Sequence, residues 1–106
     1  MDGKFNPEQE LLSGGKEVVV SGPITWGDED EVTAASLHVA ILQGKVAATG
    51  RTANDLLKGE EEFFVTAKVE GNGHLRAGDA IATGWAFLHG EGVGMYEWSV
   101  PVTLKH

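Results

Sequence analysis

The clearest signal along this chain is an alternation of apolar and polar side chains near its C-terminal end. Over residues 96–104 an apolar side chain recurs at every second position: Tyr96, Trp98, Val100, Val102 and Leu104. A period of two with polar or turn-compatible residues between is typical of a strand with one buried face. Pro101 falls in the outward set and cannot donate a ladder hydrogen bond, so we expect a sheet edge or solvent at that position.

The preceding run, residues 80–88, has one face of small residues and one of large residues. The small face holds Ala80, Ala82, Gly84, Ala86 and Leu88, and the large face holds Ile81, Thr83, Trp85 and Phe87. We expect both faces to be at least partly covered. A five-residue loop over positions 90–94 would place Leu88 opposite Tyr96 and Ala86 opposite Trp98. A closure one residue different would set Phe87 against Trp98, because a one-residue slip exchanges the faces.

A second hairpin is predicted in the middle of the chain, where two short alternating runs flank Gln43 and Gly44. If these two residues form the loop, Ile41 pairs with Val46, and the facing pairs along one side are all apolar or small. The opposite side then sets Ser36 across from Arg51 and His38 across from Thr49.

Further strands are predicted before and after this hairpin. Three consecutive valines in residues 16–22 suit an edge strand that is interrupted at Gly22 and Pro23. Residues 63–69 alternate again, and a turn over residues 71–73 would set Val69 opposite Leu75. Residues 1–15 are predicted to be a tail with a possible short helical turn, which Asn6 could cap. The single folded domain is then residues 16–106.

About seven strand segments with turn signals at intervals of roughly ten residues predict an all-β fold. Leu75, followed three residues later by Gly78 just before a strand, is similar to the corner where immunoglobulin-like and fibronectin-type sandwiches cross between sheets; the usual tyrosine is absent. The expected fold is an antiparallel β-sandwich of about seven strands, immunoglobulin-like in general architecture. A small closed β-barrel is the alternative.

Composition narrows the range of partners and compartments. The 106 residues carry 16 acidic and 8 basic side chains, a formal charge of −8, which opposes binding to nucleic acid. The absence of cysteine excludes disulfides and a thiol nucleophile. No signal peptide and no membrane span of ~20 apolar residues is expected. The cytoplasm is the default compartment, and export of a trimmed form stays open.

Candidate chemistry is sparse. His74 and His89 lie in or beside glycine-rich turns, and if these turns open at the same end of the fold they could form a metal site with Glu91 or Glu70. The acidic residues 28–31 lack the ligand spacing of an EF-hand, which favours a solvated turn over calcium binding. No hydrolase, phosphate-loop or dinucleotide pattern is present. An enzyme is therefore disfavoured, and no cofactor is expected.

The aromatic residues suggest how the protein acts. Most fall on predicted apolar faces and fit core packing. The exceptions are Phe64, which occupies the polar set of its strand, and whichever of Trp85 or Trp98 lies outward. We therefore expect a non-catalytic module that binds another protein or its own copies, with Phe64, Trp85, Phe87 and Trp98 as candidate binding residues. A carbohydrate or small-ligand binder is the alternative, and a metal-dependent enzyme built on the loop histidines is a third.

Overall fold

The computed structural model describes residues 2–25, 32–52, 56–57, 59, 61–90 and 94–106. Its strands are β1 (Asp2–Gly3), β2 (Glu8–Leu12), β3 (Glu17–Thr25), β4 (Val32–Gln43), β5 (Val46–Arg51), β6 (Leu56–Leu57), β7 (Glu62–Val69), β8 (Gly78–Gly90) and β9 (Gly94–Lys105). The helical structure in these residues is the three-residue 3-10 turn Ser13–Gly15. The all-β class and the number of main strands expected from the sequence are confirmed.

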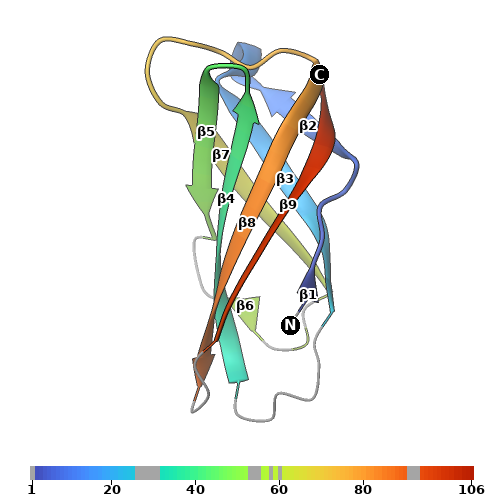
Figure 1. Ribbon diagram of the computed structural model, residues 1–106, viewed down its shortest axis with the longest axis vertical. Helices are drawn as coiled ribbons and strands as arrows, with labels where there is room; N and C mark the ends of the chain where they lie inside the picture. The colour runs from blue at the N-terminus through green and yellow to red at the C-terminus, as the bar shows by residue number, and fades with distance from the viewer. Residues whose placement is uncertain (1, 26–31, 53–55, 58, 60, 91–93) are drawn as a thin grey trace.

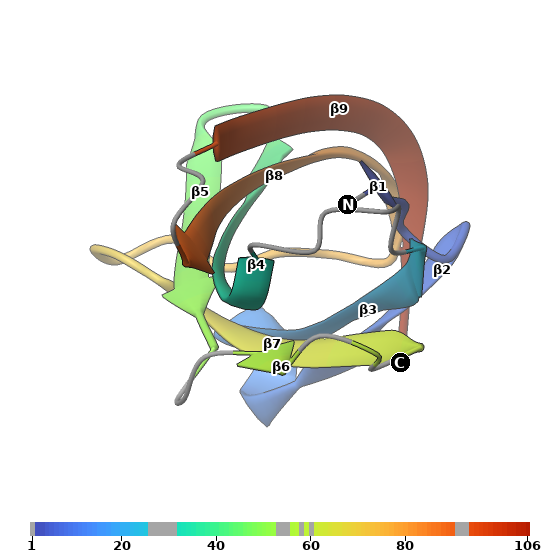
Figure 2. The same cartoon turned by 90° about the horizontal axis from the view of Figure 1, so that it is seen from below.

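Seven of the strands form a closed ring. The hydrogen-bonded order β3-β2-β9-β8-β4-β5-β7 returns to β3 through the β3–β7 pair, and β1 and β6 add to β3 and β4. β8 and β9 lie on one side of the ring and β3 and β7 on the other, as Figure 2 shows end-on. The molecule is elongated, 42 × 23 × 18 Å, with its strands running along the long axis (Figure 1). It is therefore a flattened barrel whose two broad walls pack like sandwich layers.

The core fills the space between these walls. It consists of the inward side chains of alternate positions on most strands, and its largest fully buried members include Phe63, Leu37, Ile41 and Leu75. Strand β7 shows the alternation plainly, with Phe63, Val65 and Ala67 buried and the residues between them exposed. The period of two seen in the sequence thus corresponds to the inside and outside of the barrel.

The N-terminal residues form part of the barrel, which corrects the predicted helical turn. Residues 8–12 are strand β2, antiparallel to β3 and parallel to β9, so the barrel is not wholly antiparallel. The amide of Gln9 is buried. Its Nε2 donates to the carbonyls of Asn6 (2.8 Å) and Ser21 (3.0 Å), and its Oε1 accepts from the Ser21 N–H (2.9 Å). Gln9 therefore holds the N-terminal segment on β3 instead of closing a capping box.

Strand β3 is continuous through Gly22 and Pro23, and it has neighbours on both sides, so the predicted interrupted edge strand is wrong. Residues 17–23 pair with β7 along the whole run. On the other side the N-terminal segment passes so closely that a Cβ on Gly22 would lie 1.8 Å from the Lys4 carbonyl oxygen. The Lys4 N–H donates to the Pro23 carbonyl at 3.1 Å. Glycine is required here because two backbones meet.

The β4–β5 hairpin has the predicted faces and a different register. Ile41 pairs with Ala48, and His38 pairs with Arg51, each two residues further along β5 than expected. The loop is Gly44 and Lys45 in place of Gln43 and Gly44. A shift of two keeps every side chain on its predicted side, so Leu37, Val39 and Ile41 are buried as expected.

The β8–β9 hairpin shows the same kind of difference. Trp98 lies opposite Gly84, not Ala86, and Tyr96 lies opposite Ala86. A Cβ on Gly84 would be 2.7 Å from the indole Cζ2 of Trp98, so the small residue under the ring is a glycine. The alternative closure that sets Phe87 against Trp98 is not formed. Pro101 is exposed, and at this position β8 is the one described strand that pairs with β9. The expectation of a sheet edge or solvent at Pro101 is therefore confirmed.

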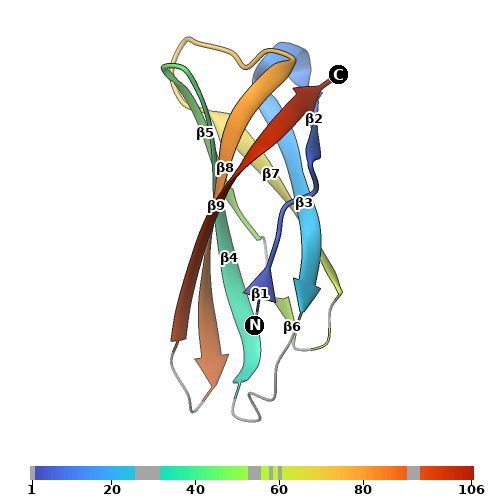
Figure 3. The same cartoon turned by 45° about the vertical axis from the view of Figure 1, so that its right-hand side comes forward.

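The connection from β7 to β8 crosses between the walls and is not a hairpin. β7 pairs with β3 and β5, whereas β8 pairs with β4 and β9, so the predicted Val69–Leu75 pair is absent. Leu75 is buried, and its N–H donates to the Gly15 carbonyl at 2.8 Å. Figure 3 shows the connection crossing the upper end of the barrel.

Candidate functional site

The large face of β8 points out of the barrel and is only partly covered, as expected from the sequence. Ala80, Ala82, Gly84, Ala86 and Leu88 are buried, while Ile81 is 43% exposed and Phe87 is 40% exposed. Ile81 and Phe87 lie roughly 20 Å apart along the strand. The small residues face inward because the interior already holds bulky side chains from the opposite wall, such as Phe63.

Neighbouring strands extend this apolar surface. Leu42 of β4, 48% exposed, lies opposite Ile81, and Met95 of β9, 61% exposed, lies opposite Phe87. We call the outward side chains of Leu42, Ile81, Trp85, Phe87 and Met95 the outer apolar face. Its members come from three adjacent strands of one wall. Of Trp85 and Trp98, Trp85 is therefore the one that points outward in the observed register.

A shallow hollow of 430 Å³ lies beside Trp85 and Phe87 of this face. Its lining includes Trp85 and Phe87 from β8, His38 from β4, and Thr49 and Gly50 from β5. The edge of the His38 ring meets Phe87 at a centroid distance of 5.4 Å and an interplanar angle of 86°. The Thr49 hydroxyl, at the rim, donates to a Glu70 carboxylate oxygen at 3.3 Å. The hollow thus combines aromatic surface with hydrogen-bonding groups.

Trp98 points inward, where it is partly buried, and does not belong to this face. Its indole packs against Phe5 at a centroid distance of 5.6 Å, and Phe5 in turn meets Phe63 edge-on at 5.8 Å. The indole Nε1 is buried, and it has no hydrogen-bond acceptor among the described residues. Trp98 therefore packs the barrel, and its selection as a surface binding residue is not supported.

Phe64 lies on the opposite wall from the outer apolar face. It is 65% exposed on β7, opposite Ser21 of β3, as its place in the polar set predicted. Beside it is a hollow of 560 Å³ whose lining includes Glu8, Ser21 and Lys105. There the Lys105 ammonium donates to the Glu8 carboxylate, and this hydrogen bond raises the pKa of Lys105. The predicted binding residues are thus separated into three places.

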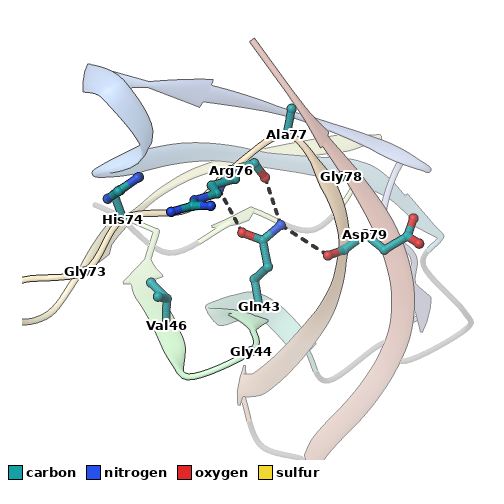
Figure 4. A pocket seen from close by; sticks show the side chains of 9 residues that line it. All are labelled: Gln43, Gly44, Val46, Gly73, His74, Arg76, Ala77, Gly78 and Asp79. Atoms are coloured by element: carbon teal, nitrogen blue, oxygen red, sulfur yellow. Dashed lines mark hydrogen bonds between the residues drawn. The ribbon is translucent and has the colours of Figure 1, made fainter.

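Another hollow, of 530 Å³, lies at the end of the barrel where His74 is found (Figure 4). The Gln43 amide bridges this end. Its Nε2 donates to the carbonyls of Arg76 (2.8 Å) and Asp79 (3.2 Å), and its Oε1 accepts from the Arg76 N–H (2.8 Å). Because both sides of the amide are used by backbone groups, Gln43 serves to anchor the β7–β8 connection to β4.

The structure does not bring the candidate metal ligands together. His74 precedes the first residue of β8, and His89 is next to its last residue, so the two backbones are more than roughly 30 Å apart. The described part of the chain contains no group of three metal-ligating side chains. Glu91, the acidic residues 28–31 and Trp26 lie outside the described residues. The two-histidine arrangement therefore does not form.

The sequence did not identify Leu42, Ile81 and Met95 of the outer apolar face, or His38 in the hollow beside it. A signal for His38 and Leu42 was present, because they occupy the same outward set of their strand as Ser36. The order of the strands could not be predicted from the sequence. In the structure β4 pairs with β8, so the outward residues of β4 lie next to those of β8. No helix in the described residues has the length and apolar character needed to cross a membrane.

Comparisons with known proteins place this chain in no family. No protein-family model matches it, and no curated protein matches it in sequence. Among solved structures it is similar to the crystal structure of ACE19, the collagen binding subdomain of the Enterococcus faecalis surface protein ACE. The identity is 11% over 96% of each chain, and the TM-score is 0.38. A likeness at this level says nothing about what the present chain binds.

Proposed function

We propose that this chain is a non-catalytic β domain that binds another protein through the outer apolar face. The observation that supports this is the exposure of large apolar side chains from three adjacent strands, with Ile81, Phe87 and Met95 each at least 40% exposed. Single exposed apolar residues are ordinary, whereas contiguous ones mark interaction surfaces.

The composition of the face agrees with such a role. Aromatic residues and methionine are enriched at the centres of protein interfaces, where a few of them supply most of the binding energy. Trp85 and Phe87 are neighbouring outward residues of β8, and the charged residues Glu97 and Arg51 lie near them. Trp85 and Phe87 are therefore the expected anchors.

A double variant, Trp85→Ser with Phe87→Ser, is expected to lose partner retention while staying folded. Both side chains face outward, so their removal leaves the core intact. The interface loses two anchor residues, each contributing about 2 kcal/mol or more to the binding free energy. The measurement is affinity capture with immobilised protein, together with sedimentation to detect self-association. Phe64→Ser is the matched control, because it removes an exposed aromatic ring from the opposite wall.

The proposal predicts that wild type and Phe64→Ser retain the same partner, or form the same oligomer, and that the double variant does neither. It is wrong if wild type is a strict monomer without partner. It is equally wrong if the double variant binds like wild type while its unfolding midpoint is unchanged.

A carbohydrate ligand is a second candidate, and the hollow around His38 favours it. Sugar rings stack on aromatic faces and need hydrogen-bonding groups at their edges, and this hollow offers Trp85 and Phe87 beside His38 and Thr49. Its openness on the barrel surface suits a chain of sugars better than an enclosed metabolite.

Titration with a panel of neutral oligosaccharides is expected to change the tryptophan emission if this second candidate holds. Trp85 would report the ligand directly, and a Trp85→Phe variant, which keeps an aromatic platform, should lose the signal while retaining binding by calorimetry. Trp98 serves as the internal reference, since it packs inside. A flat emission across the panel, with no heat of binding, would exclude a sugar.

A further inference from the structure

Among the described strands, β9 has a neighbour along only part of one of its edges. It pairs with β8 continuously from Gly94 to Leu104, and with β2 only over Thr103, Leu104 and Lys105. Below Thr103, β9 leaves β2, and no described strand runs along its far edge (Figures 1 and 3). Residues 95–101 therefore border an open side of the sheet.

The direction of the backbone groups on this stretch follows from one hydrogen bond. The Thr103 N–H donates to the Pro7 carbonyl at 2.8 Å, so the backbone of Thr103 points away from β8. In an antiparallel pair, successive residues point alternately toward and away from the partner strand. The register with β8 is unbroken, so Met95, Glu97, Ser99 and Pro101 also point away from it.

A second observation agrees with this assignment. The hydroxyls of Thr83 and Ser99 lie 3.0 Å apart across the two strands. Side chains approach most closely at positions where the two residues exchange no backbone hydrogen bonds. Pro101 belongs to the same set, so its lack of an N–H removes no hydrogen bond between β8 and β9. The open edge thus presents the N–H groups of Met95, Glu97 and Ser99 and the carbonyls of all four residues.

The surroundings of the edge are exposed on both sides of the sheet. On the outside, Met95 is 61% exposed, and it continues the outer apolar face through Phe87. On the inner side, Tyr96 is 42% exposed although it belongs to the inward set of β9. A strand added here would cover apolar surface on each of its faces.

We propose that an extended segment of a partner protein adds to the barrel as a strand along the Met95–Pro101 edge of β9, which deepens and rests on the proposed protein-binding function. Addition of a strand to an open edge satisfies backbone groups and takes specificity from alternate side chains. The segment carries a basic side chain next to Glu97, since the protein has a formal charge of −8.

A second copy of this chain is a poorer occupant. Pairing two β9 edges about Glu97 would set the two Glu97 carboxylates opposite one another, and like charges directly opposite are destabilising. Pairing them one residue further along would set Met95 against Pro101, which has no N–H to donate. Proline and charge are the usual means by which an edge is kept from pairing with itself.

The test uses the full chain and a ten-residue peptide with valine at every second position and lysine or threonine between. Binding is expected to slow amide hydrogen exchange at Met95, Glu97 and Ser99. The amides of Trp98 and Val100, which point toward β8, should be unchanged. A peptide of the same sequence, N-methylated at every residue, should not bind, because neither of its edges can donate to the β9 carbonyls.

Two variants test the edge itself. Ser99→Pro removes one edge donor and should weaken binding about tenfold, and its folding is checked by the unfolding midpoint. Glu97→Lys reverses the edge charge and should weaken binding by a similar factor, without any change of the backbone. Glu61→Lys is the matched control, because it makes the same charge change at another exposed position and should leave affinity within twofold.

The strand-addition proposal is wrong if the peptide does not bind at millimolar concentration, if the N-methylated peptide binds equally, or if protection falls on other amides. Protein binding through the outer apolar face is judged separately. If Ser99→Pro and Glu97→Lys retain the natural partner while the Trp85 and Phe87 double variant loses it, the edge is not used and the broader function stands.

Discussion

A chain without residues 1–12 is expected to be unfolded at 25 °C. The deletion removes the buried side chains of Phe5, Leu11 and Gln9 and takes β2 from between β3 and β9. Loss of a buried phenylalanine costs about 3–5 kcal/mol and of a buried leucine about 2–5 kcal/mol. Their sum is comparable to the whole stability of a small domain, about 5–15 kcal/mol. The dispersion of amide resonances, or the far-ultraviolet circular dichroism, measures the outcome.

A chain without residues 1–3 is the control, because it loses only the short β1 pairing and keeps Phe5 in place. It should remain folded, with a modestly lower unfolding midpoint. Division of the sequence into a tail over residues 1–15 and a domain over residues 16–106 predicts the opposite result for the longer deletion. A dispersed, cooperative spectrum from the chain without residues 1–12 would favour that division.

Phe63→Ala is expected to destabilise the protein by about 3–5 kcal/mol, and Phe64→Ala by no more than about 0.5 kcal/mol. The two residues have the same side chain and are adjacent in β7, yet Phe63 is 1% exposed and Phe64 is 65% exposed. The Phe63→Ala variant also lacks the edge-on contact between the rings of Phe63 and Phe5. Urea unfolding of both variants, followed by tryptophan emission, gives the two free energies of unfolding.

The comparison has its own internal check, since both variants remove the same ring from the same strand. Equal losses of stability would mean that Phe63 and Phe64 do not point to opposite faces of β7, in disagreement with the structure. A larger loss at Phe64 would require the strand to be turned over, with every side chain on the other face.

The faces of the strands could be predicted from the sequence, while the registers could not. Side-chain alternation assigned Leu37, Val39 and Ile41 to the inside, and they are buried. Both predicted hairpins were displaced by two residues, because glycines at Gly44 and over residues 90–94 permit several loop closures. A shift of two leaves the faces unchanged, so nothing in the hydrophobic pattern penalises it.

Strand β2 was not predicted because the local residue pattern favours a helical turn, whereas the strand depends on pairing with other strands. Asn6, Pro7 and Gln9 have the spacing of a helix start, and short-range propensity is a weak determinant when tertiary pairing is available. The residues that decide the matter are the partners of β2 in β3 and β9, and those in β9 lie nearly the whole chain away. A pattern read along the sequence does not include them.

The candidate site was predicted in part. Trp85, Phe87 and Phe64 were selected as surface aromatics, and they are at least partly exposed. Trp98 is a candidate on the same grounds, but it points inward and is partly buried against Phe5. The contributions of His38 and Leu42 depend on strand order, which follows from long-range pairing and not from periodicity.

The parallel contact of β2 with β9 has a consequence for how the protein is made. On the ribosome, Glu8 emerges well before its partner Thr103 is synthesised. The ring therefore cannot close until β9 has been made, and until then the edge of β2 that pairs with β9 stays free. Contacts so distant in sequence are also associated with slow folding. The nascent chain should thus depend on chaperones more than a helical protein of equal size would.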